Sequence, residues 1–205
     1  MTLPRLHVVT HDAILAAADF PGRAGALLDS LGPAVALHLR GRALGGRALH
    51  DLATGLAGAA LRSGSLLLVN ERVDVALAAR AGAHLNVGSI PLPDARRLLH
   101  HAPLGYSAHT ADEALLAQAE GADFVFLGTI FASASHPDRA PAGVELLRRA
   151  VPRLGVPVIA IGGITPGRVA EVRASGAWGV AAITGIWDAA DPVAAARAYL
   201  AALAC

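Results

Sequence analysis

The fold is indicated most directly by residues 156–186, which read VPVIAIGGITPGRVAEVRASGAWGVAAITGI. Two apolar runs of strand length, Val158–Ile161 and Val180–Thr184, flank a stretch of helix length. That stretch opens with Thr165-Pro166, a capping side chain before a proline, and closes before Gly176, which can take the left-handed conformation at a helix end. The segment therefore predicts two parallel strands joined by a right-handed helical crossover.

The same alternation runs along the rest of the chain. Apolar runs of strand length, each followed by a helix-like segment, occur at Leu6–Val9, Ala36–Arg40, Leu66–Asn70, His84–Val87, Leu104–Ser107 and Phe124–Gly128. These runs are apolar through most of their length, as strands covered on both faces should be. Eight such units in 205 residues predict a single (β/α)8 TIM barrel domain spanning residues 1–205, with an open doubly wound sheet as the alternative.

Local signals agree with these helices. Gly82 and Gly121, like Gly176, stand where a helix should end just before a strand. Thr110 with Glu113 three residues later predicts a capping box, and Asp191-Pro192 is a further helix start.

Composition excludes several classes of protein. Hydrophobic residues make up 54% of the chain and charged residues 16%, so neither disorder nor a coiled coil is expected. All 17 residues counted as Lys or Arg are Arg, which excludes a lysine Schiff base and a phosphate-loop lysine. A net charge of +1 offers no footprint for nucleic acid, which is therefore not expected as a partner.

The cysteine content and the hydropathy pattern predict a cytoplasmic protein. The one cysteine, Cys205, is the last residue, so neither a disulfide within the chain nor a cysteine-based metal site is expected. No apolar run reaches the roughly 18 residues of a membrane helix, and the first residues lack the pattern of a secretion signal. We therefore expect no membrane partner.

The turns after the last two predicted strands are candidate phosphate sites. Gly162 and Gly163 follow the seventh strand, and Ile183, Thr184 and Gly185 close the eighth. Barrels commonly bind phosphate there, because glycines let the backbone approach an anion and helix starts offer free N–H groups. The alternative is that these glycines only make tight turns.

The end of the second strand carries polar side chains at alternate positions, His38, Arg40 and Arg42. Side chains two residues apart can face the same side of a strand, so all three could line one mouth of the barrel. Two guanidinium groups there suit a second anionic or aromatic ligand group. The alternative is that the arginines form ion pairs on the surface.

Nine histidines are too many for all to be catalytic. His7, His50, His84, His100 and His101 fall within strands or on helix flanks, where a structural or solvated role is expected. The candidates that remain are His11, His38, His109 and His136. No HxH, HExxH or carboxylate-rich cluster appears, so no tightly bound transition metal is expected.

Several motifs together resemble the thiamine phosphate synthase and thiazole tautomerase (TenI) superfamily, from Leu6 to about Tyr199. The stretches that carry the resemblance are LHVVT (6–10), HLRGR (38–42), VNERVDVAL (69–77), GYSAHT (105–110), GADFVFLG (121–128), IAIGGITP (159–166) and ITGI (183–186). The resemblance implies a barrel that binds a thiazole phosphate and acts in thiamine biosynthesis.

The synthase branch couples a pyrimidine pyrophosphate to a thiazole phosphate, and the resemblance implies Mg²⁺ and a Gln-x-Arg-x-Lys strand end for it. This chain departs from that pattern, since His38 and Arg42 replace the Gln and the Lys. Glu71 replaces the first metal-binding Asp, Ser89 falls near the second, and His136 replaces a loop lysine. Asn70 and Ser107 are further candidate substrate contacts, and the SAHT stretch (107–110) looks synthase-like. Ser133 with Ser135 could replace the threonines that hold the thiazole phosphate.

The His-x-Arg-x-Arg strand end and the Phe-Leu-Gly-x-x-Phe stretch look more like the tautomerase, which moves a proton to aromatise a carboxythiazole phosphate. Thr129 stands where that branch has its catalytic histidine, and a threonine is a poor base near neutral pH. We therefore expect His136 or His109 to transfer the proton, because an imidazole titrates near the working pH.

These observations favour a TenI-like thiazole tautomerase that needs no metal or other cofactor. Two alternatives stay open: a thiamine phosphate synthase, with Glu71 as the one candidate ligand for Mg²⁺, and a non-catalytic protein that binds a thiazole or thiamine phosphate. The expected partner in each case is a small heterocyclic phosphate. The family resemblance also suggests a homodimer, for which the apolar helix Val193–Leu203 offers a face.

Overall fold

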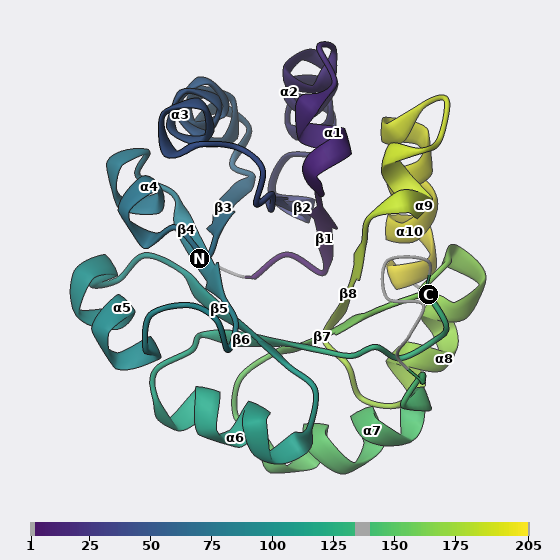
Figure 1. Cartoon of the computed structure of the whole chain (residues 1–205). Helices are drawn as coiled ribbons and strands as arrows, with labels where there is room; N and C mark the ends of the chain where they lie inside the picture. The colour runs from purple at the N-terminus through teal and green to yellow at the C-terminus, as the bar shows by residue number, and fades with distance from the viewer. Residues whose placement is uncertain (1–2, 134–139, 205) are drawn as a thin grey trace.

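The structure, a computed structural model, describes residues 3–133 and 140–204. Parallel strands pair in chain order, and the last pairs with the first, so the sheet closes into a barrel (Figure 1). The strands are β1 (Leu6–Val9), β2 (Val35–Leu39), β3 (Leu66–Asn70), β4 (Gly82–Leu85), β5 (Leu104–Ala108), β6 (Phe124–Leu127), β7 (Val158–Ile161) and β8 (Gly179–Ala182). The predicted (β/α)8 barrel is confirmed, and the open sheet is wrong.

Helices form a ring around the strands (Figure 1). They are α1 (Asp12–Ala16), α2 (Phe20–Leu31), α3 (Gly46–Ser63), α4 (Val73–Ala78), α5 (Leu92–Leu99), α6 (Ala111–Ala119), α7 (Gly143–Ala150), α8 (Val169–Ala174), α9 (Thr184–Trp187) and α10 (Pro192–Ala204), with 3-10 turns at Gly32–Ala34, Val151–Arg153 and Pro166–Arg168. No helix in the described part of the chain has both the length and the apolar character needed to cross a membrane.

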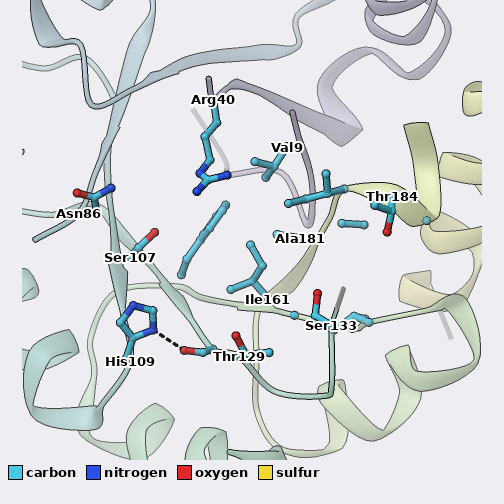
Figure 2. A pocket seen from close by; sticks show the side chains of 18 of the residues that line it. Val9, Arg40, Asn86, Ser107, His109, Thr129, Ser133, Ile161, Ala181 and Thr184 are labelled. Atoms are coloured by element: carbon cyan, nitrogen blue, oxygen red, sulfur yellow. Dashed lines mark hydrogen bonds between the residues drawn. The ribbon is translucent and has the colours of Figure 1, made fainter. Parts of the chain in front are cut away.

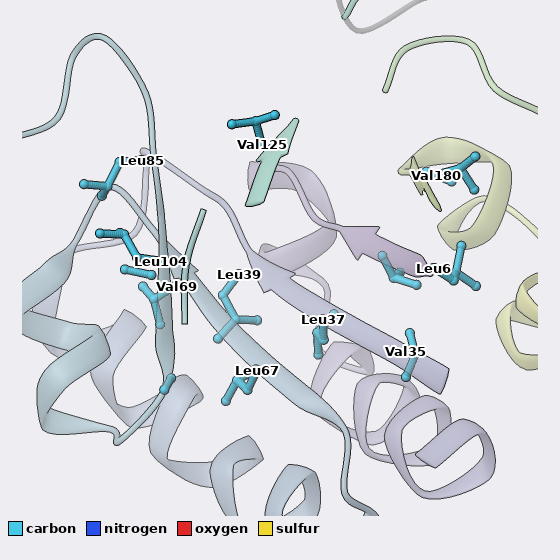
Figure 3. Packing of buried hydrophobic residues seen from close by; sticks show 14 of the residues in the cluster. Leu6, Val35, Leu37, Leu39, Leu67, Val69, Leu85, Leu104, Val125 and Val180 are labelled. Carbon is cyan, nitrogen blue, oxygen red and sulfur yellow. The ribbon is translucent and has the colours of Figure 1, made fainter. Parts of the chain in front are cut away.

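The outward-facing residues of the strands pack under the helices. Figure 3 shows this layer, in which Leu37, Leu39, Val69 and Leu85 are fully buried between the strands and the helices around them. Burying one such side chain stabilises a fold by roughly 1.5–3 kcal/mol. The layer therefore holds the ring of helices against the barrel and fixes where each strand ends.

The inward-facing residues form a second, smaller core inside the barrel. Its apolar members are Val9, Ala36, Leu66, Leu68, Phe124, Phe126, Ile159 and Ala181. His7, His38 and His84 lie in the same interior, with their rings against both phenylalanines. Gly105 makes room for these rings, because a Cβ there would lie 2.4 Å from Nδ1 of His84 and 2.3 Å from the Phe124 ring.

Two tryptophans secure the seam between β1 and β8. Trp178 donates from Nε1 to the carbonyl oxygen of Leu3 at 3.1 Å, and Trp187 donates from Nε1 to that of Val9 at 3.0 Å. The bonded residues are 175 and 178 positions apart in the sequence. The barrel is therefore closed by contacts between the two ends of the chain.

Several predicted boundaries are confirmed. Gly121 and Gly176 follow α6 and α8 with φ of +100° and +91°, in the left-handed region that favours glycine. Thr110 accepts a hydrogen bond on its Oγ1 from the backbone N–H of Glu113 at 3.1 Å, as a capping residue should. Asp191 caps α10 in the same way, since its Oδ1 accepts from the backbone of Val193 at 2.9 Å.

The prediction for Gly82 is wrong. Arg80, with φ of +55°, takes the left-handed conformation after α4, and Gly82 is instead the first residue of β4. A Cβ at Gly82 would lie 2.6 Å from the carbonyl oxygen of Pro103, so a close approach of the next strand's chain requires the glycine. The strand predicted at His84–Val87 accordingly lies two residues too late.

Candidate active site

A pocket of about 580 Å³ opens at the carboxyl ends of the strands, where barrels place their active sites (Figure 2). Its floor is apolar and includes Val9, Phe126, Ile161 and Ala181. The predicted site residues that line it are Arg40, Arg42, Asn70, Ser107, His109, Thr129, Ser133, Gly162, Gly163, Ile183, Thr184 and Gly185. Ser135 and His136 lie outside the described residues.

The loop after β7 turns sharply at its two glycines. Gly162 and Gly163 have φ of +103° and +61°, which side chains rarely adopt. A Cβ on Gly163 would lie 2.2 Å from the carbonyl oxygen of Ala132, and Phe131 donates its N–H to the carbonyl of Gly162 at 3.0 Å. The glycines therefore let this loop pack directly on the loop after β6.

The turn after β8 forms the other half of the same corner. A Cβ on Gly185 would lie 2.3 Å from the hydroxyl of Tyr199, which donates to the carbonyl oxygen of Ile164 at 2.8 Å. Thr184 and Gly185 are also the first residues of α9, and the first N–H groups of a helix have no acceptor within the helix. Small residues and helix-start amides here make a corner that an anion can approach closely.

Arg168 stands beside this corner and was not predicted from the sequence. Its guanidinium lies 4.5 Å from the centre of the Phe131 ring, its Nη1 donates to the carbonyl oxygen of Gly163 at 2.6 Å, and it lines the pocket. It adds a positive charge to a corner otherwise made of backbone and small side chains. The one sequence signal was its place in the first turn after the Gly-Gly loop, where an exposed arginine is common.

The opposite wall of the pocket carries two arginines with different surroundings. Arg40 points into the pocket (Figure 2), and its backbone N–H donates to Oγ1 of the buried Thr10 at 2.8 Å. Arg42 lies at the rim with 70% of its side chain exposed, and its Nη2 is 3.5 Å from Oε1 of Glu71. Arg40 is thus directed into the pocket, whereas Arg42 is partly engaged in a surface ion pair.

His38, which the sequence predicted as a substrate contact, does not reach the pocket. It lies one layer deeper than Arg40 and is fully buried, with its Nε2 2.8 Å from Nδ1 of His7. Burial, and then the neighbouring imidazoles of His7 and His84, hold the pKa of His38 well below its usual range. The next inward-facing residue along the chain is Arg40, which already lies at the mouth of the pocket. His38 lies below it and therefore belongs to the core.

The residues at the position of the family's metal site do not fit Mg²⁺ held by two carboxylates. Glu71 is the one carboxylate there, and its Oε1 already accepts from Nδ2 of Asn86 at 2.8 Å. Ser89 contributes a hydroxyl, which accepts from the backbone N–H of Asn86 at 3.1 Å. Residues 3–133 and 140–204 contain no group of three or more His, Cys, Asp or Glu side chains able to hold a metal ion.

His109 is the imidazole at the mouth of the pocket. Its Nδ1 lies 2.7 Å from the carbonyl oxygen of Gly128, and Figure 2 shows this bond beside Thr129. A carbonyl can only accept, so Nδ1 carries the proton and the neutral ring has its lone pair on Nε2. Nε2 makes no hydrogen bond within the described part of the chain, and it is available as a base or an acceptor.

Two polar side chains of the pocket are tied to the buried interior. Ser107 lines the pocket, and its Oγ lies 2.8 Å from Nε2 of His84, which is only 1% exposed. Asn70 is 9% exposed, and its Oδ1 has no hydrogen-bond partner in the described part of the chain. The pocket is therefore backed by a polar interior that the sequence pattern did not reveal.

Comparisons with known proteins agree on one family. A sequence model for the family described as thiamine monophosphate synthase matches residues 6–186. The chain is 41% identical over 169 residues to a thiamine-phosphate synthase of Moorella thermoacetica, a match that covers 81% of this chain and 80% of that protein.

Two further matches point the same way. The chain is 46% identical over 142 residues to a thiamine biosynthesis bifunctional protein ThiM/ThiE of Symbiobacterium thermophilum, a match that covers 68% of this chain and 30% of that longer protein. The solved structure of thiamine phosphate pyrophosphorylase from Pyrococcus furiosus superimposes with a TM-score of 0.84 at 28% identity, covering 98% of this chain and 96% of that one.

Proposed function

The chain belongs to the thiamine monophosphate synthase family, and on this premise we propose that it is a thiamine-phosphate synthase, a transferase of thiamine biosynthesis. The proposal replaces the tautomerase as the preferred activity, because the relatives carry the synthase name. The structural observation that supports it most is a pocket with two cationic walls on either side of an apolar floor. Such a pocket suits two heterocycles that each carry a phosphate group.

The corner formed by the β7 and β8 turns holds the thiazole phosphate in this proposal. Backbone amides around Gly163 and Thr184 donate to its oxygens, and Arg168 adds a charge-assisted contact. Ser133, on the adjacent loop after β6, lines the pocket (Figure 2) and can contact the same group. A monoester anion fixed there places its ring over the apolar floor.

Arg40 binds the pyrophosphate of the pyrimidine substrate from the other wall, with Arg42 at the rim. In the reaction the carbon–oxygen bond to pyrophosphate breaks, and the thiazole nitrogen supplies the electron pair for the new carbon–nitrogen bond. Negative charge develops on the departing pyrophosphate, where a fixed guanidinium stabilises the transition state more than the ground state. No proton needs to move, so the coupling requires no general base.

A second candidate, the TenI-like tautomerase, is favoured by the geometry of His109. The bond from Nδ1 to Gly128 leaves Nε2 of His109 as a base facing a pocket for one phosphorylated ring. Proton transfer between two carbons needs such a base and no metal. His136, the other predicted base, and Ser135 stay predictions, since both lie outside the described residues.

One pair of assays separates the candidates. The purified protein is given the pyrimidine pyrophosphate and the thiazole phosphate with MgCl2, because the substrate phosphates can themselves carry the ion, and thiamine phosphate is measured. The same preparation is given the carboxythiazole phosphate with EDTA, and aromatisation is followed by absorbance. Coupling supports the synthase, and aromatisation without coupling overturns it in favour of the tautomerase. Binding of thiamine phosphate without turnover in either assay would indicate the non-catalytic binder.

A further inference from the structure

The contact between His84 and Ser107 joins the sealed interior of the barrel to the pocket. His84 on β4 is 1% exposed, whereas Ser107 on β5 lines the pocket, and Nε2 of the imidazole lies 2.8 Å from the serine Oγ. Either group could be the donor, because a hydroxyl can donate or accept and a neutral imidazole has two tautomers. The choice decides where the serine proton points.

The surroundings of the other ring nitrogen settle this choice. Nδ1 of His84 is buried and has no hydrogen-bond partner within residues 3–133 and 140–204, and it faces Gly105, where a Cβ would lie 2.4 Å away. A proton on Nδ1 would be a buried donor with no acceptor, which destabilises the fold. A proton on Nε2 is instead matched by Oγ of Ser107. Burial also lowers the pKa of His84 to about 3, so the ring is neutral and holds one proton.

The neighbouring imidazoles follow the same logic. His7 donates from Nε2 to the carbonyl oxygen of Pro4 at 3.1 Å, because that oxygen can only accept. Nδ1 of His7 is then an acceptor, so His38 donates to it from Nε2 at 2.8 Å. All three interior rings therefore carry their proton on Nε2, and Nδ1 of His84, which has no hydrogen-bond partner among the residues that the structure describes, is a lone pair.

We propose that His84 is a positioning residue that donates from Nε2 to Oγ of Ser107 and thereby directs the serine proton into the pocket. Ser107 then keeps its proton for the pocket, and it favours a ligand group that accepts, such as an unprotonated nitrogen of a heteroaromatic ring. The pocket consequently discriminates against a ring that presents an N–H at this point. The identity of the ring rests on the proposed function, whereas the direction of the hydrogen bond does not.

The direction is tested in the ligand-free protein. Long-range ¹H–¹⁵N NMR of histidine-labelled protein at pH 7, with the His84 signals assigned by their loss in His84→Gln, reports which ring nitrogen is protonated. We expect the neutral tautomer with the proton on Nε2. A proton on Nδ1, or a charged ring, would overturn the proposal whatever the protein's reaction proves to be.

The effect on the ligand is tested by a double-mutant cycle with thiamine phosphate and, as a control, inorganic phosphate. We expect His84→Phe and Ser107→Ala each to weaken thiamine phosphate binding about 10-fold, and the double variant to be no weaker than Ser107→Ala alone. His84→Gln, whose amide can donate to the serine, should recover part of the loss. Inorganic phosphate should bind all variants within about 2-fold of the parent, because its corner is untouched.

Additive losses in the cycle would show that His84 does not act through Ser107, and they would overturn the proposal. If the parent protein binds inorganic phosphate but not thiamine phosphate, the proposed function is wrong, and the NMR tautomer still decides the positioning role. If His84→Phe does not fold, His84→Gln completes the cycle, and it should then be affected less than Ser107→Ala.

Discussion

The barrel interior holds nitrogen-bearing side chains at two depths, and the two levels behave differently. The deeper level contains His7, His38 and His84, which are at most 1% exposed and pack against phenylalanine rings. The upper level contains Arg40 and His109, which line the pocket. His38 lies on β2, and Arg40 is the first residue after that strand. Two positions along the chain therefore separate a core residue from one that lines the pocket.

The upper level should control activity with little effect on stability. We expect Arg40→Gln to lower kcat/KM for coupling about 10²–10³-fold, since it removes a fixed charge aimed at the departing pyrophosphate. The midpoint of thermal unfolding should change by less than about 3 °C. Arg47→Gln, on the exposed surface of α3, is the matched control and should keep parental kinetics. Equal kinetics for the two variants would contradict the role given to Arg40.

The deeper level should control stability. We expect His38→Ala to lower the free energy of unfolding by about 3 kcal/mol, because it leaves a cavity and removes the donor to His7. Denaturant titration measures this loss, and inorganic phosphate binding to the folded fraction should stay at the parental value. A stable variant that has lost phosphate affinity would show that the two levels are not separate.

Acid should lower the stability of the folded protein through the buried histidines of the deeper level. Burial lowers the pKa of His7 and of His84 from 6.5 to about 3, so in the folded protein both stay neutral while the unfolded chain takes up protons. Below pH 6.5 the unfolded state binds more protons, and the free energy of unfolding falls by about 2.7 kcal/mol per pH unit for two such groups. Above pH 6.5 these groups add no pH dependence.

The acid effect can be assigned to individual rings. Unfolding by denaturant at pH 7, 6 and 5 gives the slope for the parent protein, and His84→Phe should reduce that slope by about 1.4 kcal/mol per pH unit. His101→Phe, which removes an exposed imidazole, is the matched control for the substitution. An unchanged slope in His84→Phe would mean that His84 is charged in the folded state.

We expect the smallest effect from substitution of Arg168, because backbone N–H groups bind the same phosphate. We expect Arg168→Gln to weaken inorganic phosphate binding about 10-fold, which corresponds to one charge-assisted hydrogen bond. Calorimetric titration at low and high salt measures this affinity. High salt should reduce the difference in phosphate affinity between the variant and the parent protein. Arg173→Gln, on α8 and away from the pocket, is the control. Identical affinities in the two variants would remove Arg168 from the site.

Periodicity in the sequence was sufficient for the fold because the strands are apolar and the helix ends are marked. β1, β3 and β7 have the predicted limits. The spacing of residues along a strand does not show how deep in the barrel each side chain lies, however. His38 was therefore predicted at the mouth of the pocket together with Arg40. Gly82 was misassigned for a related reason, since the glycine is required by the close approach of Pro103, just before the neighbouring strand β5, and not by the end of its own helix.

Residues that line the pocket could be predicted from the sequence where they lie at or just after a strand end. Residues that a contact between distant segments brings to the pocket could not. Ser107 lies near the end of β5, His109 and Gly163 lie just after β5 and β7, and all three line the pocket. The importance of Arg168 depends on its position over Phe131, a contact between two loops that no local pattern encodes. The bond from His84 to Ser107 likewise joins two strands, and a histidine within an apolar run gives no sign of it.

The seam between β1 and β8 makes the folding of this chain observable. Both tryptophans of the sequence donate their indole protons across or beside that seam, to acceptors at the opposite end of the chain. Contacts of such high sequence separation form slowly, because loop-closure entropy opposes them. The intrinsic fluorescence of the protein therefore reports the joining of its first and last strands, while circular dichroism follows the earlier growth of helices.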